Sequence, residues 1–274
     1  MNMKANNALI EKHRYNPTSK QTNLLISDLH LDSIYCKKNL LKRHLNQALE
    51  LDARIFIFGD LFDAMQGKND KRSNRAEMKN LNLATAYFND IIDQNYEFLK
   101  PYQKNIALIG YGNHETSIIR HNDIDVLDIL CSKLGVVKGS YAGFVRFQFE
   151  HTRGGARRGF TMYYDHGSGG EAPVTKGIID MARANMIVEA DIIAKGHNHN
   201  RFDVDNEIMF LNQSGNIELK KQVWLRTGTY KQEFSTDGHG FMIEKGNQLK
   251  PIGGHWLDFY VKEQKLTYIT HKTD

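Results

Sequence analysis

Five short clusters of Asp, Asn and His are the feature of this sequence best suited to chemistry. They are Asp28-Leu29-His30, Gly59-Asp60, Gly112-Asn113-His114-Glu115, Asp165-His166 and Gly196-His197-Asn198-His199. Taken singly, each cluster fits a polar turn. All five, however, follow directly on a short strand-like run. Carboxylate, amide and imidazole groups are ligands for hard and borderline metal ions, so the joint pattern predicts a metal site.

Asp60 is the residue around which this predicted site is organised. It follows the apolar run 54–58, and a strand that ends in Gly-Asp delivers its carboxylate to the edge where open α/β sheets keep their sites. Because a carboxylate has two oxygens, Asp60 can bridge two ions ~3.5–4 Å apart. The other candidate ligands form one set of Asp28, His30 and His199 and a second set of Asn113, His166 and His197. A water shared by two cations ionises near neutral pH, which makes a metal-bridging hydroxide the predicted nucleophile.

Strands and helices alternate in the first half of the chain. Strands are predicted at 23–27, 54–58 and 105–109, and helices at 37–52 and 81–100. Another helix is predicted to begin at Asn122 or Asp123 and to stop at Gly135. Since β-α-β crossovers are right-handed, the first two strands should bring Asp28 and Asp60 to one edge of the sheet.

The second half is predicted to be richer in strands. A hairpin over 144–164 leads to His166, and a helix at 175–190 followed by a strand at 191–194 leads to His197. Short strands are then expected at 207–211, 222–225, 240–243 and 266–269.

The composition is that of a globular protein with one α/β domain. The 274 residues carry a net charge of +4, which permits an anionic substrate without demanding nucleic acid. Two cysteines exclude a disulfide framework. No apolar run has the ~18 residues of a membrane span or the form of a signal peptide, so we expect no membrane partner and a cytoplasmic location. The expected organisation is a polar arm over 1–22 and a single domain over 23–274.

The five clusters, in this order, resemble the pattern of the calcineurin-like binuclear metallophosphoesterases. That pattern is Asp-x-His, Gly-Asp-x-x-Asp, Gly-Asn-His-Asp/Glu, an isolated His and Gly-His-x-His, and it runs here from Asp28 to His199 without a departure at a ligand position. The resemblance implies an α/β fold with a two-sheet β-sandwich flanked by helices, and the same ligand sets. It also implies that His114 is a catalytic residue at the leaving-group or phosphate oxygen, and that Asp63 orients a ligand imidazole.

The function that we expect is metal-dependent hydrolysis of phosphate esters. Two divalent or trivalent ions are implied, with manganese as first choice and iron, zinc or nickel as alternatives. Phosphodiesters, cleaved by a nuclease or a nucleotide phosphodiesterase, are favoured by the positive charge and by the basic segment 64–80, which leaves the sheet beside Asp60. DNA or RNA is then a candidate partner. The candidate substrate contacts in this segment are Lys68, Lys71, Arg72 and Arg75.

Two other functions fit the same residues. One is a phosphomonoesterase or protein phosphatase, in which the basic segment is a lid or a solvated loop. The other is a non-catalytic scaffold that keeps the fold and the metals. Loss of His114 or of a ligand would favour the scaffold, and neither is lost.

Overall fold

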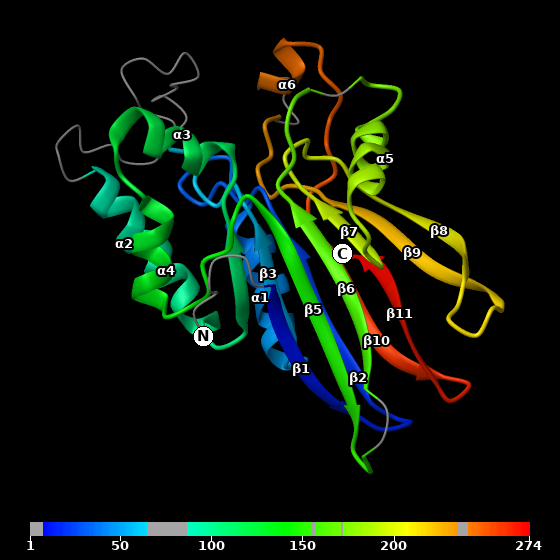
Figure 1. Cartoon of the computed structure of the whole chain (residues 1–274). Helices are drawn as coiled ribbons and strands as arrows, with labels where there is room; N and C mark the ends of the chain where they lie inside the picture. The colour runs from blue at the N-terminus through cyan, green and yellow to red at the C-terminus, as the bar shows by residue number, and fades with distance from the viewer. Residues whose placement is uncertain (1–7, 65–86, 155–156, 171, 235–240) are drawn as a thin grey trace.

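Two β-sheets pack face to face between layers of helices (Figure 1). The structure, a computed structural model, describes residues 8–64, 87–154, 157–170, 172–234 and 241–274. The six-stranded sheet has the order β1-β5-β6-β7-β9-β8, and the five-stranded sheet has the order β11-β10-β2-β3-β4. This architecture confirms the predicted α/β class and the two-sheet sandwich flanked by helices.

The strands are β1 (Leu9–Tyr15), β2 (Lys20–Ile26), β3 (Arg54–Phe58), β4 (Ile106–Gly110), β5 (Ala142–His151), β6 (Arg158–Asp165), β7 (Ile192–Lys195), β8 (Arg201–Leu211), β9 (Ile217–Thr227), β10 (His255–Lys262) and β11 (Lys265–Lys272). The helices are α1 (Lys38–Glu50), α2 (Tyr87–Leu99), the 3-10 helix η2 (Lys100–Tyr102), α3 (Asn113–Asn122), α4 (Val126–Leu134), α5 (Ile178–Ile187) and α6 (Phe241–Glu244).

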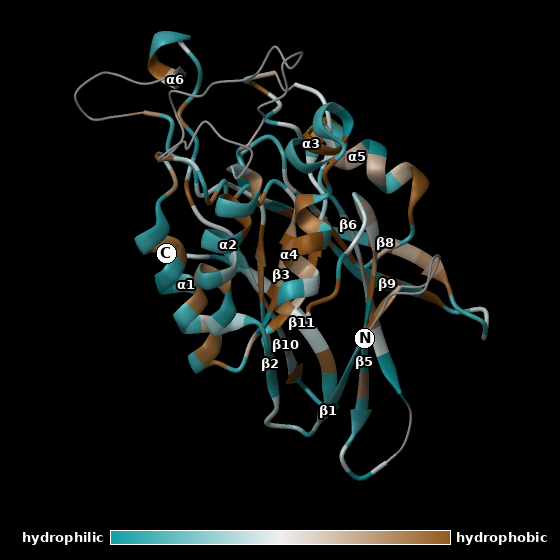
Figure 2. Ribbon diagram, turned by 90° about the vertical axis from the view of Figure 1, so that its left-hand side faces the viewer, coloured by the Kyte–Doolittle hydropathy of each residue, from teal (hydrophilic) through white to brown (hydrophobic). Residues whose placement is uncertain are grey.

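Apolar side chains fill the space between the sheets and the space under the helices. Phe56 and Phe147, from opposite sheets, are fully buried in the central layer. Helices α1, α2 and α4 cover the outer face of the five-stranded sheet, and α5 packs Met181 against Ile193 on the outer face of the six-stranded sheet. In Figure 2 the central strands are coloured mainly hydrophobic, and the helices beside them combine hydrophilic and hydrophobic residues. Because both faces of β2, β3 and β4 are covered, these strands read as nearly continuous apolar runs.

The strand directions bring the five polar clusters to one edge. Strands β2, β3 and β4 are parallel, and so are β6 and β7. The carboxyl ends of parallel neighbours meet at the same edge of their sheet. The residues that follow β2, β3, β4, β6 and β7 are those of the five clusters, so the sandwich carries them all at one end.

The N-terminal region differs from the polar arm predicted over 1–22. Leu9–Tyr15 forms β1, which pairs in parallel with β5. In this pairing Leu9 lies opposite Val145. Strand β2 begins at Lys20 rather than at residue 23. Strand β1 has few apolar residues because it is an edge strand with one solvated face, and such a strand gives a weak sequence signal.

Helix α3, which begins within the third cluster, was not predicted. The expected N-cap at Asn122 or Asp123 is wrong, because Asp123 instead ends α3 in the left-handed conformation, at φ 55°. The cap of α4 is Asp125, whose side chain accepts a hydrogen bond from the backbone N–H of Asp128 at 2.9 Å. Asn122, Asp123 and Asp125 all have side chains suited to an N-cap, so the boundary was ambiguous from sequence.

The C-terminal region contains two further corrections. The segment predicted as a strand over 240–243 is helical from residue 241, in α6. Strand β10 was missed, although it pairs with both β2 and β11. Helix α2 confirms the prediction for 87–99, and the rest of the expected helix, 81–86, lies outside the described residues. In the part of the chain that the structure describes, no helix is long and apolar enough to cross a membrane.

The docking of β1 can be tested with two adjacent residues. Leu9 is 6% exposed and Ile10 is 43% exposed. Leu9→Asp places an unpaired carboxylate against the core and should cost ~2–3 kcal/mol, which lowers the thermal midpoint by ~4–10 °C. Ile10→Asp makes the same change on the solvated face and should shift the midpoint far less. Equal midpoints for the two variants would show that β1 is not docked in solution.

Candidate metal centre

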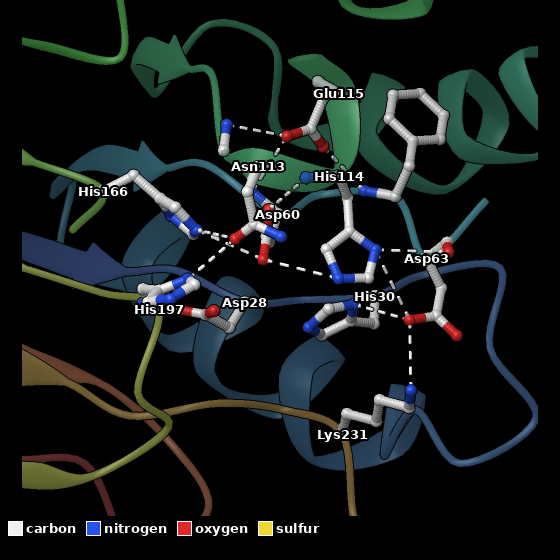
Figure 3. A network of polar contacts seen from close by, with 12 residues as sticks. Asp28, His30, Asp60, Asp63, Asn113, His114, Glu115, His166, His197 and Lys231 are labelled. Carbon is white, nitrogen blue, oxygen red and sulfur yellow. Dashed lines mark hydrogen bonds and ion pairs between the residues drawn. The ribbon is translucent and has the colours of Figure 1, made fainter. Parts of the chain in front are cut away.

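The five clusters converge on one buried site at the end of the sandwich (Figure 3). Strand β2 leads to Asp28 and His30, and β3 leads to Asp60. Asn113 is the first residue of α3, and β6 and β7 lead to the remaining histidines. Asp28, His30, Asp60 and His166 are each at most 2% exposed. All seven predicted ligands therefore lie on elements that meet at this edge.

Three groups of side chains bring their ligand atoms within 4.8 Å of one another. The groups are Asp28 with His30 and His199, His30 with Asp60 and His114, and Asp60 with His166 and His197. Asn113 joins the third group, since its Oδ1 lies 3.1 Å from His166 Nε2 and 2.7 Å from His197 Nδ1. These Asp and His clusters have the donor types and the spacing to bind divalent metal ions.

Three of the four ligand histidines have a polar contact on the side away from the cluster. His30 places Nδ1 2.9 Å from Asp63 Oδ1, so Nε2 faces the cluster. His166 Nδ1 lies 2.8 Å from the carbonyl oxygen of Phe58, and His197 Nε2 lies 3.1 Å from that of Gly169. A nitrogen that donates to these acceptors leaves the other nitrogen unprotonated in neutral imidazole. This is the usual support of a metal-binding histidine.

One buried carboxylate oxygen at the site lacks a hydrogen-bond partner. Asp28 Oδ1 is buried and has no hydrogen-bond partner among the described residues. The Nε2 of His199 lies 3.4 Å from this oxygen and also 3.4 Å from His30 Nε2. Buried polar atoms nearly always have a partner. A cation among these three side chains would satisfy the oxygen, so the residues present fit a metal ion.

The pKa values describe a site with concentrated negative charge. Burial raises the pKa of Asp28, but the nearby imidazoles of His199 and His166 lower it to about 2. Burial opposes ionisation of Asp60 as well, yet the charges of His166 and His114 hold its pKa well below the usual value. Burial lowers the pKa of His166, whereas the charge of Asp60 raises it to about 10. Protonated imidazoles thus balance the carboxylates, and a bound cation would replace those protons.

The backbone is left-handed at several ligand positions. Positive φ values occur at Asp28 (53°), His30 (46°), Asp60 (49°), His197 (73°) and His199 (57°). This conformation costs a non-glycine residue free energy, and residues that adopt it cluster at functional sites. The strain turns the side chains of three different loops towards one point.

Glu115 holds the loop that carries Asp60. Its carboxylate accepts hydrogen bonds from the backbone N–H groups of Asp60 (3.1 Å), Phe62 (3.0 Å) and Gly112 (2.7 Å). Burial and the charge of Asp60 raise the pKa of Glu115 to about 7. The sequence contained Glu115 only as the last member of the third cluster, without this role.

The two residues with roles implied by the resemblance lie together beside the ligands. His114 Nδ1 is 3.2 Å from the carbonyl oxygen of Asp63, and His114 Nε2 faces Asp60 Oδ2 at 3.7 Å. Asp63 Oδ1 contacts His30 and also Lys231 Nζ, at 3.1 Å. Lys231 was not predicted, because 168 residues separate it from Asp63 and nothing local marks it. The predicted substrate contacts Lys68, Lys71, Arg72 and Arg75 lie outside the described residues.

No family model and no curated protein matches this chain. Similar solved structures include vacuolar protein sorting 29 from Cryptosporidium parvum, with 15% identity, 93% of this chain and 98% of that chain covered, and a TM-score of 0.37. A metallophosphoesterase from Sphaerobacter thermophilus has 13% identity, coverage of 93% and 89%, and a TM-score of 0.37. A predicted phosphoesterase from Streptococcus pneumoniae TIGR4 has 13% identity, coverage of 92% and 99%, and a TM-score of 0.31. At these TM-scores the similarities carry no weight for function, which depends on the site described above.

The role of Glu115 can be measured as stability of the metal-free protein. Glu115→Ala leaves three buried N–H groups without an acceptor and should lower the free energy of unfolding in urea by ~2–4 kcal/mol. Glu97→Ala, which truncates a glutamate that is 69% exposed, is the matched control and should stay near the wild type. A wild-type unfolding curve for Glu115→Ala would show that this glutamate does not hold the loop.

Proposed function

We propose that this protein is a metal-dependent phosphoesterase in which Asp60 is shared by two metal ions. One observation carries the proposal: Asp60 belongs to two of the ligand groups, with His30 and His114 in one and His166 and His197 in the other. A carboxylate in that position can give one oxygen to each of two ions. The buried and unpaired Asp28 Oδ1 supports a cation on the His30 side.

The chain offers a complete set of donors for each ion. Asp28, His30 and His199 would hold the first ion with Asp60, and Asn113, His166 and His197 would hold the second with Asp60. Two such ions, when bound, supply a water of lowered pKa and positive charge against the phosphate oxygens. Oxygen and imidazole donors favour manganese, with iron, zinc and nickel as alternatives.

His114 is the residue of this chain that we assign to proton transfer. Its Nδ1–H is directed at the carbonyl of Asp63, which leaves Nε2 as the nitrogen that faces the cluster. Burial lowers the pKa of His114 to about 4, against the opposite effect of Asp60. A negatively charged phosphate beside Nε2 would favour its protonated form. His114 could then hold a proton at Nε2 for the leaving-group oxygen.

Phosphodiesters are the substrate class that we propose, cleaved as a nuclease or a nucleotide phosphodiesterase would cleave them. The support is the net charge of +4 and the basic segment after Asp60, with Lys68, Lys71, Arg72 and Arg75 as proposed contacts. The deciding experiment compares turnover of bis-(p-nitrophenyl) phosphate, p-nitrophenyl phosphate, cyclic nucleotides, and single- and double-stranded DNA by the manganese-loaded protein. A preference for the monoester would identify a phosphomonoesterase instead. Tight metal binding without turnover of any ester would identify a scaffold.

Asp60→Asn tests the shared carboxylate. The amide keeps the size of the side chain but loses the negative charge and one oxygen donor, so most diesterase activity should disappear while the circular dichroism spectrum stays that of the wild type. Metal content, measured after dialysis, should fall as well. Full activity in Asp60→Asn, or in wild type with excess chelator, would rule out the mechanism.

His114→Ala tests proton transfer. We expect kcat to fall by ~10²–10⁴-fold with the metal content unchanged, because this is the usual contribution of general acid–base catalysis. The loss should shrink for p-nitrophenyl esters, whose leaving group needs little protonation, and should be largest for alkyl esters. An equal loss for both kinds of ester would assign His114 to substrate positioning.

A further inference from the structure

A partly buried network of ion pairs lies beside the ligands and contains none of them. Asp180, in the first turn of α5, has Oδ1 2.9 Å from Lys195 Nζ and Oδ2 2.8 Å from Arg226 Nη2. Lys195 is 4% exposed and Arg226 is fully buried. Cationic side chains are seldom buried unless a carboxylate pairs with them. Asp180 is thus the carboxylate that serves both cations, and their charges lower its pKa against the effect of burial.

Lys195 and Arg226 each contact the end of a strand that is followed by a ligand histidine. Lys195 is the last residue of β7, two positions before His197, and its Nζ is also 2.8 Å from Asp165 Oδ2. Asp165 is the last residue of β6 and directly precedes His166. Arg226, on β9, donates from Nη1 to the carbonyl oxygen of Gly196. One carboxylate on α5 therefore connects the loops that carry His166 and His197.

The loop after β7 has little freedom to move away from this network. A Cβ on Gly196 would lie 2.4 Å from Ser27 Oγ and 2.7 Å from Asp28 Oδ2, so this loop packs directly against the residues that follow β2. Asn200 Nδ2 donates to the carbonyl of Lys176 at 3.0 Å, and His197 Nε2 contacts the carbonyl of Gly169. A change at the base of the loop is consequently passed to the imidazole of His197.

The other ligand set has a separate support. Asp63 contacts His30, and Lys231 contacts Asp63 (Figure 3). Thr229 donates from Oγ1 to the carbonyl of Asp28 at 2.9 Å. Among the described residues, no hydrogen bond or ion pair of Asp180 reaches either Asp28 or His30. The two sets meet where the backbone N–H of His197 donates to Asp28 Oδ2 at 2.9 Å, but the charged groups that support them differ.

We propose that Asp180 is a positioning residue for one half of the metal centre. Through Lys195 and Arg226 it sets the geometry of His166 and His197 directly, and it reaches the set of Asp28, His30 and His199 only through the loop after β7. This inference rests on the proposed two-metal function. Groups that orient metal ligands typically change metal affinity by ~10–100-fold when they are removed. The consequence is that Asp180 governs the affinity for one ion of the pair.

The test is a calorimetric titration of the metal-free protein with Mn²⁺. Wild type should show two binding events. In Asp180→Asn, which keeps the size of the side chain and removes its charge, one dissociation constant should rise by ~10–100-fold and the other should rise far less. Asp180→Glu restores the charge and should recover part of the lost affinity. Glu189→Gln, which removes an exposed negative charge just after α5, is the matched control and should leave both events unchanged.

A second variant identifies which event belongs to which half. Asp63→Asn should weaken the event that Asp180→Asn affects less, and the double variant should weaken both. Electron paramagnetic resonance of the manganese-loaded proteins gives an independent readout, since only a pair of ions with a shared ligand shows the spectrum of coupled spins. Asp180→Asn at one equivalent of Mn²⁺ should show an isolated ion.

The outcomes separate failure of this inference from failure of the function. A stoichiometry of one Mn²⁺ ion per chain in wild type would refute the two-metal proposal. Two events in wild type with both unchanged in Asp180→Asn, or both weakened equally, would overturn the role of Asp180 and leave the function standing. If Asp180→Asn does not fold, Lys195→Gln removes the link to β6 and β7 while it keeps the pair of Asp180 with Arg226, and the same selective loss is expected.

Discussion

The negative charge of Asp60, held almost entirely out of water, is the constraint on which the site depends. A carboxylate that is 2% exposed is stable only if charges and N–H groups surround it. His166 Nε2 lies 3.2 Å from Oδ2, and the backbone N–H of His114 donates to Oδ1 at 3.0 Å. Two further buried carboxylates belong to the same site, where Asp28 lies beside His199 and Asp63 beside His30. So much buried negative charge favours cations as its natural counterpart.

The sandwich supplies the rigidity that such a site requires. Parallel strands of both sheets end at one edge, and the apolar layers on either side of each sheet fix where those ends lie. Left-handed backbone at ligand positions such as Asp28 and His197 costs free energy, which the packed core offsets. The hydrogen bonds of Glu115 and the ion pairs of Asp180 add to this rigidity, since each connects a ligand-bearing loop to a helix. The metal centre is therefore a property of the interface between sheets and helices, not of any single loop.

The ligand clusters could be predicted from sequence because each is local: a polar group follows an apolar run, as at β3, whose bounds 54–58 were predicted correctly. The supports could not be predicted. Arg226 lies 46 residues from Asp180, and Lys231 lies 168 residues from Asp63, so neither pair leaves a pattern in a window of sequence. Strand β1 was missed for a related reason, because its identity depends on pairing with β5 far along the chain.

The position of His114 bears on the choice between catalysis and a non-catalytic scaffold. His30 and Asp60 already belong to the ligand sets on either side, so His114 is left over once those sets are assigned. Its Nε2 is 3.7 Å from Asp60, beyond hydrogen-bonding distance, while Nδ1 is engaged by the Asp63 carbonyl. His114 also belongs, with His30 and Asp60, to a group whose ligand atoms lie within 4.8 Å of one another, so it has the position of a possible ligand as well. An imidazole nitrogen that faces the carboxylates fits proton transfer to a reacting oxygen and equally fits a metal-binding scaffold, so turnover of a phosphate ester, not the position of His114, distinguishes the two functions.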